Sequence, residues 1–285
     1  MPDKDQYIQQ IIGHYPDLGI STAEFNHDGQ YNDVLIVNDA LVFRFAKVQP
    51  AIETLKQEIA ILNHIQGKID TPVPEPAFTA IDTDKIGDAY MGYKRIPGTP
   101  LMRETFKAIP AASKPLLAEQ IAGFLKTLHS IKPLDSFPTR DTVDIWEDMF
   151  DRIQKKLFPL MRQDAHEQVS GHFQSFLNSP SLFTPRLRHG DFGTGNILIN
   201  PETYHLAGII DFGFAGVGDP ATDFAGLLIC YGVDFYGECA RHYPEMQTAL
   251  PRARFYIETF ALQEALFGIE NDDTDALKAG LKTYI

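Results

Sequence analysis

The chain has 285 residues, with 25 Lys and Arg against 38 Asp and Glu, so its formal net charge is −13. This excess of acid excludes nonspecific nucleic-acid binding and docking on an anionic membrane, because both rely on basic side chains that neutralise phosphates. Hydrophobic residues make up 44% of the chain and charged residues 22%, which is typical of a folded protein rather than a disordered one.

The acidic residues are not spread evenly along the chain. Residues 1–96 carry a net charge of −6, residues 97–199 a net charge of +1, and residues 200–285 a net charge of −8. An acidic surface attracts cationic partners where it lies beside a site, and elsewhere it only keeps a protein soluble. The sequence leaves both interpretations open.

Cysteine usage and the N-terminal residues indicate the compartment. Cys230 and Cys239 form no disulfide framework and no zinc motif, so we expect reduced thiols packed in the core. The first residues are polar and lack an apolar signal core, and the longest apolar run, over 224–231, is too short to span a bilayer. These features predict a cytoplasmic protein with no membrane partner.

The first third of the chain predicts a small β-rich lobe with one main helix. Runs of β-forming residues at 34–37 and 41–45 flank a polar turn at 38–40, which is typical of a hairpin. Apolar residues then recur at helical spacing over 51–66. A polar loop over 28–32 with one glycine precedes the first strand.

A proline-rich connector follows the helix. Three prolines over 71–76 predict an extended segment, and strands are expected near 77–81 and 89–96. Pro97, Gly98 and Pro100 then interrupt the pattern. We place the boundary between an N-lobe of residues 1–96 and a C-lobe of residues 97–285 there.

The C-lobe is predicted to be mostly helical. The expected helices cover 116–131, 142–163, 166–178 and the chain after Pro220. The exception is the segment 186–213, where a polar loop rich in glycine precedes two short apolar strands at 197–199 and 206–210. The whole pattern predicts a fold of the α+β class.

The chemistry is concentrated in His189-Gly190-Asp191 and the loop to Asn196, followed by Asp211-Phe212-Gly213. A hairpin between the two segments would bring Asn196 and Asp211 side by side, and amide and carboxylate oxygens are ligands that suit Mg²⁺. Asp191 would then be free to accept a proton from a hydroxyl. Each residue alone is more commonly a turn cap, but the joint spacing is typical of a kinase catalytic loop and metal loop.

These motifs resemble those of the aminoglycoside phosphotransferase and choline-kinase-like superfamily, small-molecule relatives of protein kinases that carry His-Gly-Asp in place of His-Arg-Asp. The segment Asp219-Pro220-Ala221-Thr222-Asp223-Phe224-Ala225 also resembles the family pattern. The strand 42–45, the proline-rich connector and the segment 208–213 are most similar to those of aminoglycoside 2″-phosphotransferases. The resemblance covers about residues 20–265 and implies a bilobal, protein-kinase-like fold.

The resemblance implies a kinase that moves the γ-phosphate of ATP or GTP to a hydroxyl of a small, cationic molecule with the help of Mg²⁺. Asp191 would be the catalytic base, and Asn196 and Asp211 the metal ligands. His189 and Asp223 would support the catalytic loop without taking part in the chemistry.

The resemblance also assigns residues to the nucleotide. Arg44, paired with Glu58, would contact the α- and β-phosphates, although protein kinases and many drug-modifying members of the family carry lysine there; Lys47 is a possible substitute. The further candidates are Gly29 and Gln30 in the covering loop, Lys94 and Ile96 through their backbone at the interlobe hinge, and Leu198 and Ile210 beneath the base. Ordinary roles as strand, helix-surface or core residues remain open for all of them.

The acceptor is less constrained. Candidate acceptor-binding residues are Asp234, Glu238, Glu264 and Glu270, in the segment of net charge −8. Each is also an ordinary solvated helix residue. An aminoglycoside or macrolide antibiotic is one acceptor class, and choline, a sugar, methylthioribose or homoserine is the metabolic alternative. A nucleotide-binding regulator without turnover is a third possibility.

Overall fold

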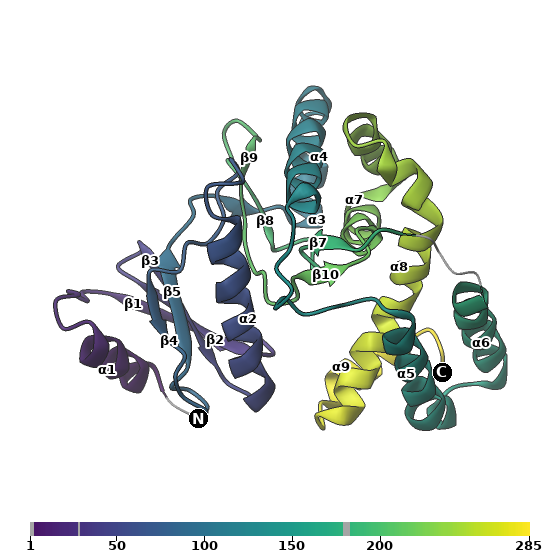
Figure 1. Cartoon of the computed structure of the whole chain (residues 1–285), viewed down its shortest axis with the longest axis horizontal. Coiled ribbons are helices and arrows are strands. Elements are labelled where there is room, and N and C mark those ends of the chain that lie inside the picture. Colours follow the sequence, from purple (N-terminus) through teal and green to yellow (C-terminus); the bar gives the residue numbers. More distant parts are fainter. Residues whose placement is uncertain (1–2, 28, 179–182) are drawn as a thin grey trace.

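The computed structural model describes residues 3–27, 29–178 and 183–285, and it places a β-sheet lobe beside a mostly helical lobe (Figure 1). The first lobe holds a five-stranded antiparallel sheet in the order β1-β2-β3-β5-β4. Its strands are β1 (Ala23–Asn26), β2 (Asn32–Val37), β3 (Leu41–Ala46), β4 (Phe78–Ala80) and β5 (Tyr90–Lys94). The α+β class and the kinase-like arrangement are as expected.

The predicted hairpin joins β2 to β3. Val37 pairs with Leu41 across the turn, and Asn38 and Asp39 adopt left-handed backbone angles with φ of 54° and 53°. Asn and Asp tolerate this conformation better than other residues with a side chain, and it matches the twist of a hairpin. The turn residues therefore set the register of the strand that carries Arg44.

Side chains alternate between the two faces of β3, and this alternation determines which of them face the cleft. Phe43 and Phe45 are buried with Tyr7 on the face covered by α1 (Lys4–His14). Arg44 lies between them and points to the opposite face, where it meets Glu58 of α2 (Gln49–Ile65). Figure 1 shows α2 between the sheet and the second lobe, so the Arg44 face of the sheet is the one turned to the cleft.

Sequence reasoning missed α1 and β1. The signal for α1 was a capping box: Gln6 N donates to Asp3 Oδ1 at 2.9 Å, and Asp3 N donates to Gln6 Oε1 at 3.0 Å. Only Tyr7 and Ile11 of this helix are buried, so its apolar stripe was too narrow to stand out.

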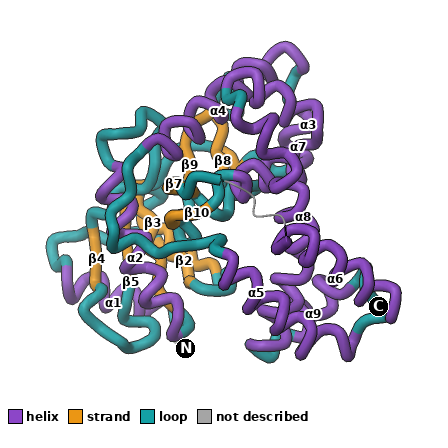
Figure 2. The backbone as a smooth tube through the Cα atoms, turned by 45° about the vertical axis from the view of Figure 1, so that its right-hand side comes forward, coloured by secondary structure: helices purple, strands orange, loops and turns teal. Residues whose placement is uncertain are grey.

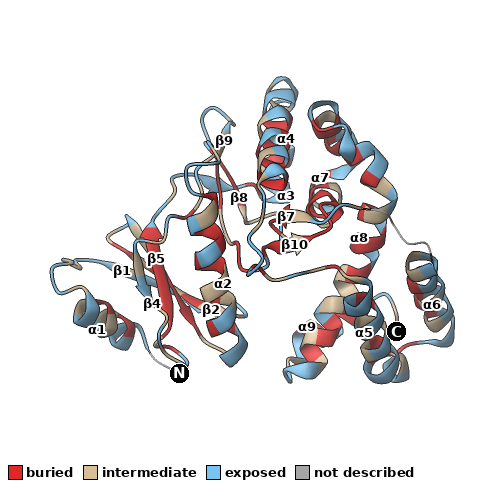
Figure 3. Ribbon diagram, in the orientation of Figure 1, coloured by how far each residue is buried: buried red, intermediate tan, exposed pale blue. Residues whose placement is uncertain are grey.

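The second lobe is built mainly from helices (Figure 2). They are α3 (Arg103–Ala108), α4 (Lys114–Ser130), α5 (Val143–Arg152), α6 (Gln163–Asn178), α7 (Ala221–His242), α8 (Glu245–Glu270) and α9 (Thr274–Leu281). The remaining strands are β6 (Thr99–Pro100), β7 (Arg186–Arg188), β8 (Ile197–Ile199), β9 (Leu206–Ile209) and β10 (Gly216–Gly218). Figure 3 shows buried residues along α4, α7 and α8, and α7 packs against both α4 and α8.

The helix predicted over 142–163 is divided. After α5 the chain forms a π-helix over Ile153–Leu157 and a 3₁₀ turn over Phe158–Leu160. Pro159 lacks an N–H and disfavours the helix in the turn before it, which is consistent with the change of helix type over this segment. Cys239 is buried and Cys230 partly buried, and both are free thiols as expected.

The lobes are joined along one edge. The chain leaves the five-stranded sheet after Lys94 and joins a sheet of β6, β8 and β9 at Thr99, on either side of the boundary placed after residue 96. A second link is formed by the proline-rich connector, where Ile209 N donates to Pro72 O at 2.9 Å. Within the described ranges, no helix is long and apolar enough to cross a bilayer.

Candidate functional site

The loop that holds Asp191 begins with a close backbone approach at Gly190. Gly190 has a φ of 87°, and a side chain at this position would collide with the guanidinium of Arg188 and the carbonyl of Phe214. Arg188 is itself held by Asp141, whose Oδ2 accepts from Arg188 Nε at 2.6 Å. Only glycine fits here, because it tolerates the positive φ and has no Cβ.

Asp223, near the start of α7, braces this loop from beneath. Its buried carboxylate accepts hydrogen bonds from His189 N at 2.9 Å and Gly190 N at 2.7 Å, and His129 Nε2 lies 3.0 Å away. Burial alone would raise the pKa of Asp223, but the contact with His129 and the nearby cations outweigh it and hold the pKa below its ordinary value. The carboxylate stays ionised and fixes two backbone groups of the loop.

Both ring nitrogens of His189 are in use. Asp191 N donates to His189 Nδ1 at 3.3 Å, so the ring hydrogen lies on Nε2, which is 3.0 Å from Ile210 O. The ring therefore links the Asp191 loop to the segment before Asp211. No ring nitrogen is left to accept a proton from a substrate.

Asn196 fixes one side of Asp191. Asn196 Nδ2 donates to both the backbone O and the Oδ2 of Asp191, each at 2.9 Å. This turns the amide nitrogen toward Asp191 and leaves Asn196 Oδ1 as the atom available to a metal. Burial and the negative charge of Asp211 raise the pKa of the Asp191 carboxyl above its ordinary value, against the opposing effect of His189 and Asn196.

Arg44 joins the two lobes at the centre of the site. Its Nη1 donates to Glu58 Oε1 at 2.5 Å and its Nη2 donates to Asp211 Oδ1 at 2.7 Å. Glu58 Oε1 also accepts from Phe212 N at 3.0 Å. Burial opposes the charge of Arg44, but Asp211 and Glu58 outweigh burial and raise its pKa, so the guanidinium is permanently charged.

Asp211 presents its carboxylate from an unusual backbone conformation. Its φ is 65°, in the left-handed region that a residue with a side chain rarely adopts, and its side chain is 41% exposed. Burial raises the pKa of Asp211, but Arg44 and His189 outweigh burial, so the pKa of Asp211 lies below its ordinary value. The group is therefore an ionised, accessible oxygen donor.

Five of the residues expected at the site share one cavity of about 240 Å³. They are Gly29, Gln30, Arg44, Asp191 and Asp211. The cavity is completed by Tyr31, Asn32, Val34, Thr54, Gly213 and Phe214. The predicted covering loop also included Asp28, which lies outside the described residues.

Lys94, Ile96, Leu198 and Ile210 do not line this cavity. Lys94 and Ile96 border a separate cavity of about 540 Å³, together with the proline-rich connector. Leu198 is buried in β8, and Ile210 is half-buried beside Asp211. Their proposed contacts with the base remain predictions.

Lys47 does not take the place of Arg44. Its Nζ donates to His27 O at 2.9 Å and lies 3.8 Å from Asp33 Oδ1. It lines a larger cavity of about 640 Å³ instead of the one that contains Asp191.

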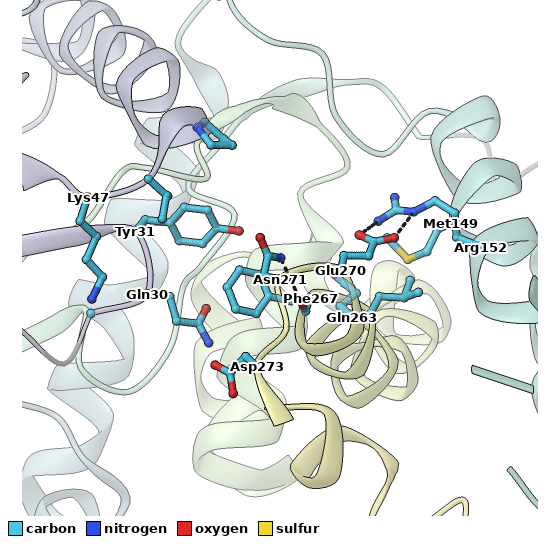
Figure 4. Close-up of a pocket in the computed structure, with 14 residues that line it drawn as sticks. Gln30, Tyr31, Lys47, Met149, Arg152, Gln263, Phe267, Glu270, Asn271 and Asp273 are labelled. Atoms are coloured by element: carbon cyan, nitrogen blue, oxygen red, sulfur yellow. Dashed lines mark hydrogen bonds and ion pairs between the residues drawn. The ribbon is translucent and has the colours of Figure 1, made fainter. Parts of the chain in front are cut away.

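The larger cavity lies between the N-lobe loop and the helices α5 and α8 (Figure 4). Of the four acceptor candidates, Glu270 lines it, but two cations already hold this carboxylate. Arg152 Nε and Nη2 donate to it at 3.0 and 2.5 Å, and Lys156 Nζ donates at 2.8 Å. The hydrogen bond from Arg152 is the main reason that the pKa of Glu270 lies below its ordinary value.

The other acceptor candidates lie outside both cavities. Asp234 is exposed just beyond a kink in α7 at Gly232, where φ is 84°. Glu238 pairs with Arg241 at 2.6 Å, and Glu264 is exposed on α8. Asp273, another acid of residues 200–285, also lines the larger cavity, and its Oδ1 accepts from the backbone N–H groups of Asp275 and Ala276. The acceptor contacts of these carboxylates remain predictions.

Sequence reasoning placed Tyr31 in the covering loop but missed the two aromatic residues that pack against it, Phe214 and Phe267. Tyr31 lies 5.8 Å from Phe214 and 5.7 Å from Phe267, measured between ring centroids. Phe214 directly follows the Asp-Phe-Gly motif, which was the available signal for it. Nothing in the sequence placed Phe267 beside the N-lobe.

The donors fit a magnesium ion. In the described part of the chain, no cluster of three or more His, Cys, Asp or Glu side chains has the geometry of a protein-only metal centre. Asn196 and Asp211 offer an amide oxygen and an ionised carboxylate next to the cavity. Mg²⁺ commonly uses such a small set of protein oxygens and completes its shell with phosphates and water.

Comparison with known proteins agrees with this geometry. Viomycin phosphotransferase of Streptomyces vinaceus is 29% identical over 272 residues, covering 90% of this chain and 91% of the relative. The structure of the GDP and kanamycin complex of APH(2″)-IIIa has a TM-score of 0.90 at 26% identity, covering 98% of this chain and 97% of the other. Macrolide 2′-phosphotransferase type I, with a TM-score of 0.77 and 18% identity, covers 99% of this chain and 98% of its own and shows the shared fold alone.

The family model described as the phosphotransferase enzyme family matches residues 22–256, which is most of the chain. The match contains the Arg44 strand, the Asp191 loop and the Asp211 segment. The chain therefore belongs to the phosphotransferase enzyme family.

Proposed function

We propose that the protein transfers the γ-phosphoryl group of ATP or GTP to a hydroxyl of a small polar antibiotic. The observation that carries this proposal is the meeting of Arg44, Asp191 and Asp211 in one cavity beneath the loop with Gly29 and Gln30. The free thiols and the need for a nucleoside triphosphate favour the cytoplasm as its location.

Asp191 acts as the base in this proposal. Asn196 holds its Oδ2, so Oδ1 is the oxygen that receives the proton of the acceptor hydroxyl. A raised pKa makes the ionised carboxylate a better proton acceptor than an ordinary aspartate. His189 and Asp223 hold the loop and do not contact the reacting atoms.

Residues on both sides of the cleft would balance the negative charge of the phosphates. Arg44 leaves or shares its contact with Asp211 and binds phosphate oxygens, while Glu58 keeps it oriented. Gly29 and Gln30 cover the phosphates through backbone N–H groups. When bound, Mg²⁺ held by Asn196 and Asp211 would neutralise charge on the transferred phosphoryl group.

The larger cavity is the acceptor side in this proposal. Gln263 Nε2 donates to Thr259 Oγ1 and Asn271 Nδ2 donates to Phe267 O, both at 2.9 Å. The amide oxygens of Gln263 and Asn271 are then left to accept hydrogen bonds from a ligand. Such oxygens suit ammonium and amide N–H groups, as found on viomycin and kanamycin, which the relatives' names contain.

The deciding experiment is nucleotide turnover with each of a panel of acceptors: viomycin, kanamycin, gentamicin, a macrolide and choline. We expect turnover to depend on an antibiotic and Asp191→Asn to lower kcat by roughly 10²- to 10⁴-fold with nucleotide binding intact. Asp135→Asn, at an exposed position outside the cleft, is the matched control.

The outcomes separate the alternatives. Turnover with choline and none with the antibiotics would replace the acceptor class and keep the reaction. Tight nucleotide binding without turnover on any acceptor would indicate a regulator. Activity of Asp191→Asn equal to that of Asp135→Asn would remove Asp191 from the mechanism.

A further inference from the structure

The aromatic ring of Tyr31 borders both cavities of the cleft. Like Gly29 and Gln30, Tyr31 lines both the cavity that contains Asp191 and the larger cavity bordered by α8, and it is the aromatic residue of the three. Figure 4 shows its side chain reaching from the N-lobe over the larger cavity, with the hydroxyl directed toward Asn271. A ligand that shifts this ring from one cavity would therefore also change the wall of the other cavity.

The ring is held from both lobes. It packs edge-on against Phe214 at 5.8 Å and tilted against Phe267 at 5.7 Å, between centroids. Phe214 lies three residues after Asp211, and Phe267 lies on α8 one turn before Glu270. Phe214 remains 47% exposed, so this contact lies at the surface of the cleft and not in the core.

The backbone of Tyr31 is tied to the phosphate side. Lys47 N donates to Tyr31 O at 3.0 Å, and β2 begins at the next residue, Asn32. Gly29 and Gln30, the two preceding residues, line the cavity that holds Arg44. A nucleotide that orders Gly29 and Gln30 would also set the position of the Tyr31 ring.

We infer that Tyr31 is a positioning residue that couples the two substrates, so that bound nucleotide sets its ring against Phe267 and completes the wall of the acceptor cavity. This inference rests on the proposed function and goes beyond it, because it assigns a specific residue to substrate synergy. Coupling between two ligands is reciprocal, so acceptor must strengthen nucleotide binding by the same factor.

The test is calorimetric titration of kanamycin and viomycin into the full chain, with and without a non-hydrolysable ATP or GTP analogue and Mg²⁺. In the wild-type protein we expect nucleotide to strengthen acceptor binding about fivefold or more. Tyr31→Leu reduces that factor toward one, whereas Tyr31→Phe keeps the ring and retains it. The readout is a ratio of affinities, which a general loss of stability does not change.

Phe267→Leu is the second variant for this test, because Phe267 lines the larger cavity and not the cavity that contains Asp191. We expect it to remove the same synergy, and the double variant with Tyr31→Leu to lose nothing further. Additive losses would mean that Tyr31 acts only through direct contact with nucleotide, which overturns the coupling. Phe25→Leu, an exposed ring in the same lobe, is the control.

Failure of this inference is distinct from failure of the proposed function. Acceptor-dependent turnover with unchanged synergy in Tyr31→Leu would overturn the role of Tyr31 and leave phosphotransfer in place. Wild-type binding of acceptor that ignores nucleotide would do the same. Absence of turnover with every acceptor would overturn both.

Discussion

Arg44 and Asp211 form an ion pair across the cleft, with Arg44 Nη2 2.7 Å from Asp211 Oδ1. The same guanidinium holds the buried Glu58, so one side chain ties β3, α2 and the Asp211 segment together. The planar fork of arginine can contact two carboxylates at once with two different nitrogens, which a lysine ammonium cannot do with fixed geometry. Arginine at position 44, in place of lysine, therefore links these three segments of the chain.

Removal of Arg44 should destabilise the fold as well as weaken nucleotide binding. Arg44→Ala leaves Glu58, which is 1% exposed, without its cation, and we expect a loss of about 3–5 kcal/mol in the free energy of unfolding. Chemical denaturation measures this loss. Adding Glu58→Gln should restore part of the stability but not nucleotide affinity, and a double variant as unstable as Arg44→Ala would contradict the buried-charge explanation.

Asp211→Asn should act on the metal requirement. The amide keeps the size of the side chain but removes the ionised oxygen, so we expect the Mg²⁺ concentration for half-maximal activity to rise at least about tenfold. Chelation with EDTA should abolish turnover in the wild-type protein. The measurement is rate against free Mg²⁺, with Asp272→Asn, an exposed position, as control. An unchanged Mg²⁺ dependence would remove Asp211 from the metal site.

Gly190→Ala should disable the catalytic loop. The added methyl group meets Arg188 and Phe214 O, and the φ of 87° disfavours any residue with a Cβ. We expect kcat to fall by more than about 100-fold and stability to drop by about 1–3 kcal/mol. Gly237→Ala is the matched control, because a Cβ there meets no atom within 4 Å, and helix propensity predicts equal or higher stability.

The pH dependence should report Asp191. Its carboxyl must be ionised to accept a proton, and burial raises its pKa, so kcat is full above that pKa and falls as the pH drops through it. The acidic limb should therefore lie above the ordinary aspartate value of about 3.9. Single-turnover rates over the acid range measure it. A limb at or below the ordinary value would show that another group controls the rate.

The chemistry-bearing segments were predictable because short-range geometry brings them together. Asn196 and Asp211 flank β8 and β9, which pair as a hairpin, so spacing along the chain implied their proximity. The role of Asp223 was implied by the family resemblance of a motif that begins eight residues beyond Asp211. In such cases local turns do most of the positioning.

Features that depend on packing between distant segments were not predictable in the same way. Tyr31 and Phe267 meet only because α8 returns to the N-lobe loop, and no sequence motif links the two residues. Charge counted along the chain likewise does not show that Arg152 and Lys156, from another segment, hold Glu270. A net charge per segment is informative only after its partners are located.

The hydrogen bond from Ile209 N to Pro72 O has a consequence for motion between the lobes. Together with the crossing of the chain at residues 95–98, it fastens the lobes twice along the same edge of the cleft. We therefore expect the two lobes to open by rotation about that edge. The contact between Tyr31 and Phe267 joins the loop before β2 to the C-terminal end of α8, so a rotation that opens the cleft would separate these two rings.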